Sequence, residues 1–272
     1  LAHRDSAIVG VAAVPLVEMY DTAETLIGGQ GGKIRLGTGI QTIERDRVIT
    51  TAGEELRADA VICAVPPERA VRLVAPDLQA MDPRFLAMAR ITHSPILGVH
   101  MTFDRPVLPV HSAVLVNRPT QWLFRKSPPG EPPEMLGSHI HAVISAADEW
   151  MPLDEGEISR RVLADVNACL PAARRANLRS SRPVKEKLAT FAPTPEVEAL
   201  RPTTFGPSGV VLAGDYVQTG WPGTMEGATR SGYLAAGALL EREPGNMLVP
   251  SLRPGRIVSI LAPELARSLA SA

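Results

Sequence analysis

The stretch "VVLAGDYVQTGWPGTMEGATRSGYLAAGALL", Val210 to Leu240, is the most organised part of the chain. An apolar strand ends at Gly214-Asp215, a turn rich in Gly, Trp and Pro follows, and a helix begins at about Met225. A continuously apolar strand is typical of a parallel sheet covered by helices. Ligands of open α/β folds bind at the carboxyl edge of such a sheet, and this is where Asp215 lies.

The first turns of the helix carry almost only small side chains, among them Gly227, Ala228, Ser231 and Gly232. Free N–H groups and small side chains at a helix start allow a phosphate or an electron-rich ring to come close. A carboxylate such as Asp215 accepts hydrogen bonds from sugar or ribityl hydroxyls. The combination predicts a cofactor site. The alternative is that the small residues only let the helix pack tightly on the sheet.

Composition sets broad limits on function. The chain has 272 residues, 45% of them hydrophobic and 21% charged, with a net charge of −1. These values describe an ordinary globular protein of one large or two interleaved domains, with no general attraction for nucleic acid or anionic membranes. Cys63 and Cys169 lie in apolar segments without metal or redox spacing, which indicates a reducing, cytoplasmic compartment.

Periodicity predicts a helix from Pro15 to Ile27, a strand in "KIRL" at 33–36, and an antiparallel meander with turns near 45–46 and 52–53. The run Ala60–Val65 is apolar throughout and predicts a second strand buried on both faces. Twelve of the 25 prolines fall between Pro66 and Pro133, which indicates a change to looped, antiparallel architecture.

Beyond that change, strands are expected at Leu97–Phe103, 113–117, 121–125, 135–145 and in "VKEKLATF" at 184–191. A helix is expected from Asp154, with a capping box to Glu157, as far as Leu170. The fold class is therefore α/β (α+β), with an antiparallel-sheet domain inserted into a parallel-sheet domain. The expected boundaries are 1–66 and 206–243 for the first domain, 67–205 for the insert and 244–272 for a C-terminal tail.

Four stretches in order carry a family resemblance: "GGKIRLGTGIQTIE", "ADAVICAVPP", "VKEKLATFAPTPEVEALRP" and "LAGDYVQTGWPGTMEGATRSGYLAA". The last resembles the carboxy-terminal FAD motif of the flavin amine oxidase and phytoene desaturase superfamily. Together the four resemble the hydroxysqualene dehydroxylase family of hopanoid biosynthesis. The resemblance runs from roughly Val14 to Leu240 and implies that the first domain is the remainder of a Rossmann-like FAD-binding domain and the insert a substrate domain.

The resemblance implies a role for each residue that matches the motif. Asp215, following Gly214, would bind the ribityl chain of FAD. Met225, Gly227 and Ala228 would lie against the flavin or its pyrophosphate. The remaining positions are Ile40 beside the adenine, Val65 and Pro66 beside the cofactor, and Glu226 as a helix N-terminal charge.

The chain departs from the family pattern because no GxGxxG lies between a strand and a helix; "GGQGGK" and "GTG" lack the spacing. In the family this fingerprint lies near the N-terminus and cradles the ADP part of FAD. The abrupt start at Leu1 agrees with its absence. We therefore expect a missing N-terminal half, with a trimmed chain as the alternative, and expect the fragment alone to be inactive.

Two departures argue against amine oxidation. Amine oxidases of the superfamily typically carry an aromatic residue before Met-Glu-Gly, where this chain has Thr224, and a Lys in the strand corresponding to "PILGVHMTF", which has none. Both suit an apolar isoprenoid substrate. The candidate pocket residues are Trp221, Pro222, Thr224, His100, Trp122 and Phe124, with packing roles as alternatives.

The resemblance thus predicts reductive dehydroxylation of hydroxysqualene to squalene by an FAD enzyme, with a phytoene-type desaturase and an inactive half-protein as alternatives. His139-x-His141 is a candidate metal pair but lacks a third ligand at convincing spacing, so no metal site is predicted. The tail "GRIVSILAPELARSLASA" has near-helical apolar spacing and could touch a membrane peripherally; a docking helix is the alternative.

Overall fold

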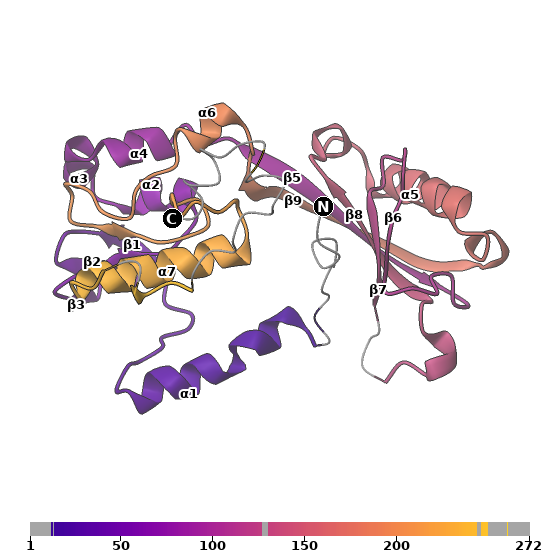
Figure 1. The fold of residues 1–272 in the computed structure, drawn as a ribbon, viewed down its shortest axis with the longest axis horizontal. Helices are drawn as coiled ribbons and strands as arrows, with labels where there is room; N and C mark the ends of the chain where they lie inside the picture. Colours follow the sequence, from indigo (N-terminus) through magenta and orange to yellow (C-terminus); the bar gives the residue numbers. More distant parts are fainter. Residues whose placement is uncertain (1–11, 13, 127–129, 244–245, 250–259, 261–272) are drawn as a thin grey trace. The chain divides into compact units, whose positions relative to one another are not determined.

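The computed structural model describes residues 12, 14–126, 130–243, 246–249 and 260. The chain folds into two compact units (Figure 1). Unit 1 comprises residues 1–91 together with 198–272, and unit 2 comprises residues 92–197. The predicted mixture of helices with a parallel strand pair and an inserted antiparallel sheet is confirmed. The first junction lies between residues 91 and 92, later than the predicted 66/67. The second lies between residues 197 and 198, earlier than the predicted 205/206.

Proline explains the shift of the first junction. Three short helices follow β4: α2 (Pro67–Leu73), α3 (Pro76–Met81) and α4 (Pro83–Met88). Each carries proline in its first turn, where the missing N–H costs nothing because that group has no intrahelical partner. The proline-rich run from Pro66 to Pro83 therefore builds helices of unit 1, and the expectation of looped, antiparallel structure there is wrong.

Unit 1 contains two small sheets. The predicted meander is confirmed as β1 (Ile40–Ile43), β2 (Arg47–Thr50) and β3 (Glu55–Arg57), paired antiparallel in that order. The second sheet is a parallel pair, β4 (Ile62–Cys63) and β10 (Val211–Leu212), in register Val211 to Ile62 and Leu212 to Cys63. β10 is fully buried, whereas Ile62 is 43% exposed. The prediction that β4 is buried on both faces is therefore wrong for Ile62: Val61 and Cys63 are buried on one face, whereas the described residues leave the other face, which carries Ile62, partly uncovered.

The N-terminal part of unit 1 packs little. The predicted helix is confirmed as a 3-10 turn, η2 (Leu16–Tyr20), leading into α1 (Asp21–Gly29), and neither contains a buried residue. The predicted strand "KIRL" is wrong: residues 33–36 form no strand, and Leu36 is 87% exposed. Alternating Ile34 and Leu36 make a strand only where a neighbouring strand pairs with them, and no described strand does so.

Unit 2 is a five-stranded sheet in the order β6-β7-β8-β5-β9. Its strands are β5 (His93–Phe103), β6 (Ser112–Val114), β7 (Trp122–Lys126), β8 (His139–Ser145) and β9 (Leu178–Phe191), all paired antiparallel. The 3-10 turns η3 (Pro133–Met135), η4 (Asp148–Trp150) and η5 (Ala173–Arg175) lie in its connections. β9 begins six residues earlier than predicted because it pairs along nearly the whole of β5.

One face of this sheet packs against α5 (Glu155–Cys169) (Figure 1). The predicted apolar face of β5 is confirmed: Leu97, Val99, Met101 and Phe103 are at most 1% exposed. The predicted helix cap is also confirmed, since the Glu157 N–H donates to Asp154 Oδ1 at 2.8 Å. The opposite face of the sheet is only half-buried along β5 and β8.

The chain returns to unit 1 through α6 (Pro195–Glu198), β10 and α7 (Met225–Leu239). Val211 and Ala213 of the strand segment pack against Ala235 of α7. Within the described part of the chain, no helix is long and apolar enough to cross a membrane. Apart from Ile260, the tail for which membrane contact is one expectation lies outside the described residues.

Candidate functional site

The carboxyl ends of the parallel strands β4 and β10 meet at one edge of their sheet, as the sequence predicts. β4 runs into Ala64, Val65 and Pro66, and β10 runs into Gly214 and Asp215. The Gly214 N–H donates to Ser231 Oγ of α7 at 2.7 Å, and that hydroxyl donates to the Ala228 carbonyl at 2.6 Å. Ser231 therefore fastens the strand end to the first turns of α7.

Gly214 is required by its own neighbours. Its φ is +147°, a conformation that side chains rarely adopt, and a Cβ there would lie 2.4 Å from the Tyr216 ring. Tyr216 is 2% exposed, and its hydroxyl has no partner among the described residues. Burial raises the pKa of this phenol, with the neighbouring Cys63 and Asp215 raising it further, so the hydroxyl is neutral. Glycine at position 214 is thus explained by packing against Tyr216, independently of any ligand at the sheet edge.

Arg201 organises the turn between β10 and α7. Its side chain is 1% exposed, and the guanidinium donates to the carbonyls of Asp215, Tyr216, Val217 and Trp221 at 2.7–3.3 Å. It also forms a two-pronged ion pair with Glu198, both distances 2.9 Å. One buried side chain therefore fixes the whole connection from the strand end to the helix start. Sequence reasoning missed this role; its only signal is a lone arginine between Leu200 and Pro202.

A second buried arginine positions the approach to β10. Arg84 of α4 is paired with fully buried Asp82 at 2.7 Å and donates to the carbonyls of Thr203, Thr204 and Val210. Burial acts to raise the pKa of Asp82, but hydrogen bonds from Arg84 and Ser208 outweigh it and lower that pKa to about 2. Asp82 is therefore ionised wherever the protein is folded near neutral pH.

The start of α7 is capped by Thr224, whose Oγ1 accepts the Gly227 N–H at 3.1 Å. A Cβ at Gly227 would lie 2.7 Å from the Pro222 carbonyl, so glycine there makes room for the turn itself. At Gly232 a Cβ would meet nothing within 4 Å. Glycine is therefore required at position 227 by close packing, whereas no such contact requires it at position 232.

Trp221 and Glu226 are both engaged by Arg230. The Arg230 guanidinium lies 5.6 Å from the centroid of the Trp221 ring and 3.5 Å from a Glu226 carboxylate oxygen one helical turn earlier. Pro222 is exposed beside them. The Trp221 side chain is thus packed on unit 1, and Glu226 lies in the first turn of α7, where the helix dipole favours an anion.

The geometry can be tested against FAD at Asp215. Its backbone carbonyl is held by Arg201, while its half-buried carboxylate has no hydrogen-bond partner among the described residues. The N–H groups of Met225 and Glu226 precede the first capped N–H of α7, so the helix dipole leaves positive charge there. The Asp215 carboxylate could accept hydrogen bonds from the hydroxyls of a polyol, and the start of α7 could bind an anion. The turn from β10 to α7 joins the two, so this arrangement fits a polyol chain linked to an anion, as in FAD. Ile40 is half-buried in β1, Val65 is half-buried and Pro66 is exposed after β4.

The second candidate region is the face of the unit 2 sheet opposite α5, which is half-buried along β5 and β8 and exposed at Ser180, Arg182 and Val184 of β9. Residues directly opposite in antiparallel strands share a face. Across β7, β8, β5 and β9 the pairings give three adjacent rows: Trp122, Val143, Gly98 and Val184; Phe124, His141, His100 and Arg182; Lys126, His139, Thr102 and Ser180. The predicted pocket residues His100, Trp122 and Phe124 therefore share this face.

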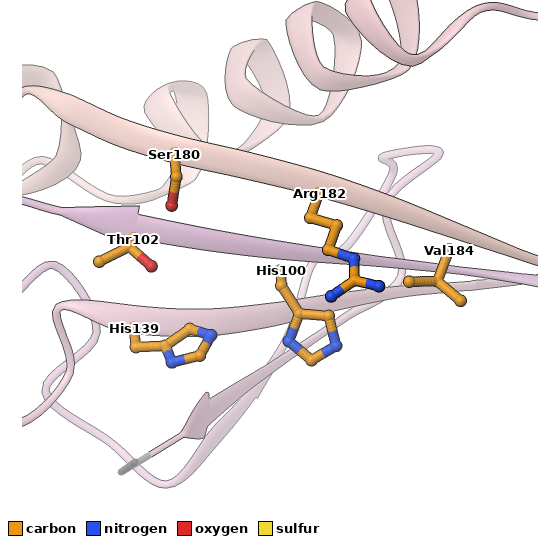
Figure 2. A pocket seen from close by; sticks show the side chains of 6 residues that line it. All are labelled: His100, Thr102, His139, Ser180, Arg182 and Val184. Carbon is orange, nitrogen blue, oxygen red and sulfur yellow. The ribbon is translucent and has the colours of Figure 1, made fainter.

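A hollow of about 480 Å³ opens on this face, lined by His100, Thr102, His139, Ser180, Arg182 and Val184 (Figure 2). The figure shows the Arg182 side chain reaching toward the His100 ring. Beside the hollow, the rings of His100 and His141 stack with centroids 4.2 Å apart, and those of Trp122 and Phe124 at 5.6 Å. A Cβ at Gly98 would lie 2.5 Å from His141 Nε2, so glycine leaves room for that ring.

The three histidines are held neutral. Burial lowers the pKa of His141 to about 4, with His100, Lys126 and His139 adding to the effect. Burial also lowers the pKa of His100, as do the charges of His139, Lys126 and Arg182. The pKa of His139 shifts in the same direction because burial outweighs the opposing charge of Glu131. Within the described residues, no group of three His, Cys, Asp or Glu side chains is arranged to hold a metal ion.

The sequence is similar to known flavin-dependent oxidoreductases and related enzymes. A family model described as flavin containing amine oxidoreductase matches residues 18–240. A hydroxysqualene dehydroxylase of Sinorhizobium fredii is 31% identical over 235 residues, 84% of this chain and 50% of that protein. A 15-cis-phytoene desaturase of Solanum lycopersicum is 25% identical over 243 residues, 84% of this chain and 40% of that protein. The chain spans about half the length of the curated relatives it matches.

A solved structure of reduced UDP-galactopyranose mutase has a similar fold, with a TM-score of 0.61 over 84% of this chain and 53% of that one. The sequence identity is 11%, so the likeness concerns the fold alone.

Proposed function

Because the chain belongs to the flavin-containing amine oxidoreductase family, we propose that the whole protein is an FAD-dependent oxidoreductase acting on an apolar isoprenoid. The proposed reaction is reductive dehydroxylation of hydroxysqualene to squalene, a step towards hopanoids. The observation that carries this choice is the 31% identity, over 84% of the chain, to a protein named hydroxysqualene dehydroxylase. When bound, the reduced flavin would supply hydride.

In this proposal the turn held by Arg201 is the flavin-binding element. The Asp215 carboxylate accepts hydrogen bonds from the ribityl hydroxyls, because it lies at the sheet edge without a hydrogen-bond partner in the part of the chain that the structure describes. The start of α7, from Met225 to Ala228, provides N–H groups and positive dipole to the flavin or its pyrophosphate. Val65, Pro66 and Ile40 provide apolar contacts.

The choice against amine oxidation is supported by Thr224 and by β5. Thr224, in the place of the aromatic residue typical of amine oxidases, serves as the helix cap. On its half-buried face β5 presents Gly98, His100 and Thr102 and no lysine. Trp221, Pro222, Trp122 and Phe124 are the proposed apolar contacts of the substrate. Since such a substrate partitions into the bilayer, we propose that the protein is cytoplasmic and works at the membrane surface.

A desaturase acting on phytoene is the second candidate. It is favoured by the 25% identity, again over 84% of the chain, to 15-cis-phytoene desaturase. The two candidates differ in redox sense, since a desaturase removes hydrogen from its substrate whereas a dehydroxylase adds it.

The assay supplies the whole protein with hydroxysqualene under reducing conditions and, separately, with phytoene and with a primary amine. Squalene formed from hydroxysqualene alone supports the proposal. Desaturated phytoene without squalene favours the second candidate, and turnover of the amine contradicts both.

The flavin site is tested separately by the absorbance of bound flavin. Asp215→Asn should lower the flavin content, whereas Asp59→Asn should leave it unchanged, because exposed Asp59 precedes β4 at the opposite end of the strand pair. Equal flavin content in the two variants would contradict the placement of FAD.

A further inference from the structure

The hollow on the face of the unit 2 sheet opposite α5 has a donor-rich end. Its lining combines the guanidinium of Arg182, the imidazoles of His100 and His139, and the hydroxyls of Thr102 and Ser180. None of these lining side chains is a carboxylate, and Arg182 has no ion-pair partner among the described residues. Uncompensated cationic and hydroxyl donors around one space are the arrangement that binds oxyanions.

Further charged groups lie around the hollow. Lys126 of β7 lies opposite His139, in the same row as Thr102 and Ser180. Two carboxylates lie at the margins: Glu131 is hydrogen-bonded to Ser138 at 3.2 Å, and Glu186 lies two residues beyond Val184 on β9. The two cations and the two carboxylates balance over the whole region, but the lining of the hollow itself holds one cation, Arg182, and no carboxylate.

The adjoining row of the sheet is apolar in sequence, although the His141 ring of the next row lies over Gly98. Val184, Gly98, Val143 and Trp122 follow one another across β9, β5, β8 and β7, and Phe124 stacks on Trp122. Pockets for organic ligands typically measure about 300–1,000 Å³. The hollow, at about 480 Å³, falls in that range and exceeds the needs of a lone inorganic anion.

We propose that this face binds a phosphate-type oxyanion at Arg182, Lys126, Thr102 and Ser180, as the head group of a ligand whose apolar chain lies along the row from Val184 to Trp122. The head-group site goes beyond the proposed dehydroxylation, because the substrate of that reaction carries no charge. The apolar row is shared with it, since Trp122 and Phe124 are also proposed contacts of that substrate.

Protonation is linked to this binding. The charged and titratable groups around the site are Lys126 and Arg182, the three histidines, and Glu131 and Glu186 at the margins. His100 and His139 have lowered pKa values, so they are neutral donors or acceptors at pH 7. A bound oxyanion favours their protonated forms and raises both pKa values. This effect favours binding at lower pH, whereas protonation of a phosphate monoester, whose second pKa is about 6, opposes it over the same interval.

The test is calorimetric titration of the full chain with inorganic phosphate, decyl phosphate below its micellar concentration, and decanol. At pH 8, where both are mainly dianions, decyl phosphate should bind at least about tenfold more tightly than inorganic phosphate. Equal affinity for the two phosphates would keep the oxyanion site and overturn the apolar extension. Decanol binding as tightly as decyl phosphate, or no binding of either phosphate, would overturn the proposal.

Matched variants separate a built site from general charge. Arg182→Gln should weaken decyl phosphate binding at least about tenfold, and Lys126→Gln provides a second, exposed position. Arg179→Gln removes the same charge from the same strand outside the hollow and should change affinity less than about twofold. If Arg179→Gln costs as much as Arg182→Gln, with far-UV circular dichroism unchanged, binding is nonspecific and the proposal is wrong.

Discussion

Replacing Arg201 with methionine should destabilise unit 1 by about 3–5 kcal/mol. Methionine keeps much of the volume of the buried side chain but removes every hydrogen-bond donor. The carbonyls of residues 215, 216, 217 and 221 then lose a donor, and each unsatisfied buried acceptor costs about 1–3 kcal/mol. Water that enters the turn can hydrogen-bond some of these carbonyls, so the expected loss of stability is about 3–5 kcal/mol and not the full sum over the four carbonyls.

The partner Glu198 supplies the matched control. Its side chain is 59% exposed, so Glu198→Gln breaks an ion pair in high dielectric and should cost less than about 1 kcal/mol. Arg201→Lys should fall between the two, because one ammonium cannot reach all the carbonyls that the guanidinium fork serves.

The assay is urea unfolding followed by tryptophan fluorescence. The chain has three tryptophans, and replacing Trp122 and Trp150 with phenylalanine leaves Trp221, in the turn held by Arg201, as the reporter. An unchanged urea midpoint for Arg201→Met, or a Glu198→Gln variant that is equally destabilised, would refute the view that one buried arginine holds this turn together.

Three further outcomes are expected. Gly227→Ala should cost about 2 kcal/mol because of the Pro222 carbonyl, whereas Gly232→Ala should stabilise the fold by up to about 1 kcal/mol in urea unfolding, and the opposite order would contradict the packing described. Asp82 has a folded pKa of about 2, below its ordinary 3.8, so its ionised form stabilises the fold above pH 4. This contribution is lost as the pH falls through 2. Asp82→Asn should therefore cost on the order of 2 kcal/mol at pH 7 and make the free energy of unfolding depend less on pH in the acid range. His141, with its pKa lowered from 6.5 to about 4, should make unit 2 less stable as the pH falls through that interval, and a His141→Gln variant with the same pH profile would exclude this cause.

Much of the fold could be predicted from periodicity and capping. The alternation in β5 separates a buried face from a half-buried one, and Asp154 with Glu157 marks the start of α5. Local signals fix such elements because the pattern itself determines which side chains face the core. "KIRL" shows the limit, since an alternating pattern has no effect without a neighbouring strand.

The candidate site was predictable in part. The strand end, the turn and the helix start could be read from Gly214-Asp215 and Met225, because the strand-turn-helix pattern is continuous in sequence. The roles of Arg84 and Arg201 could not, since they depend on carbonyls that only the folded turns bring together. The grid of histidines on unit 2 likewise required the register of β8 on β5, which no local pattern specifies.

The pairing of β5 with β9 has a consequence for the order of folding. His93 lies opposite Phe191, and the Ala192 N–H donates to the Thr92 carbonyl at 2.8 Å, so unit 2 begins and ends one strand spacing apart. Once unit 2 has folded, roughly a hundred residues act as a short connection between the two segments of unit 1. The loop between β4 and β10 then shortens from about 150 residues to about 45, which lowers the entropic cost of closing it by roughly 1 kcal/mol. Unit 2 can therefore form first, from one continuous stretch of chain, and bring β4 and β10 closer together along the chain.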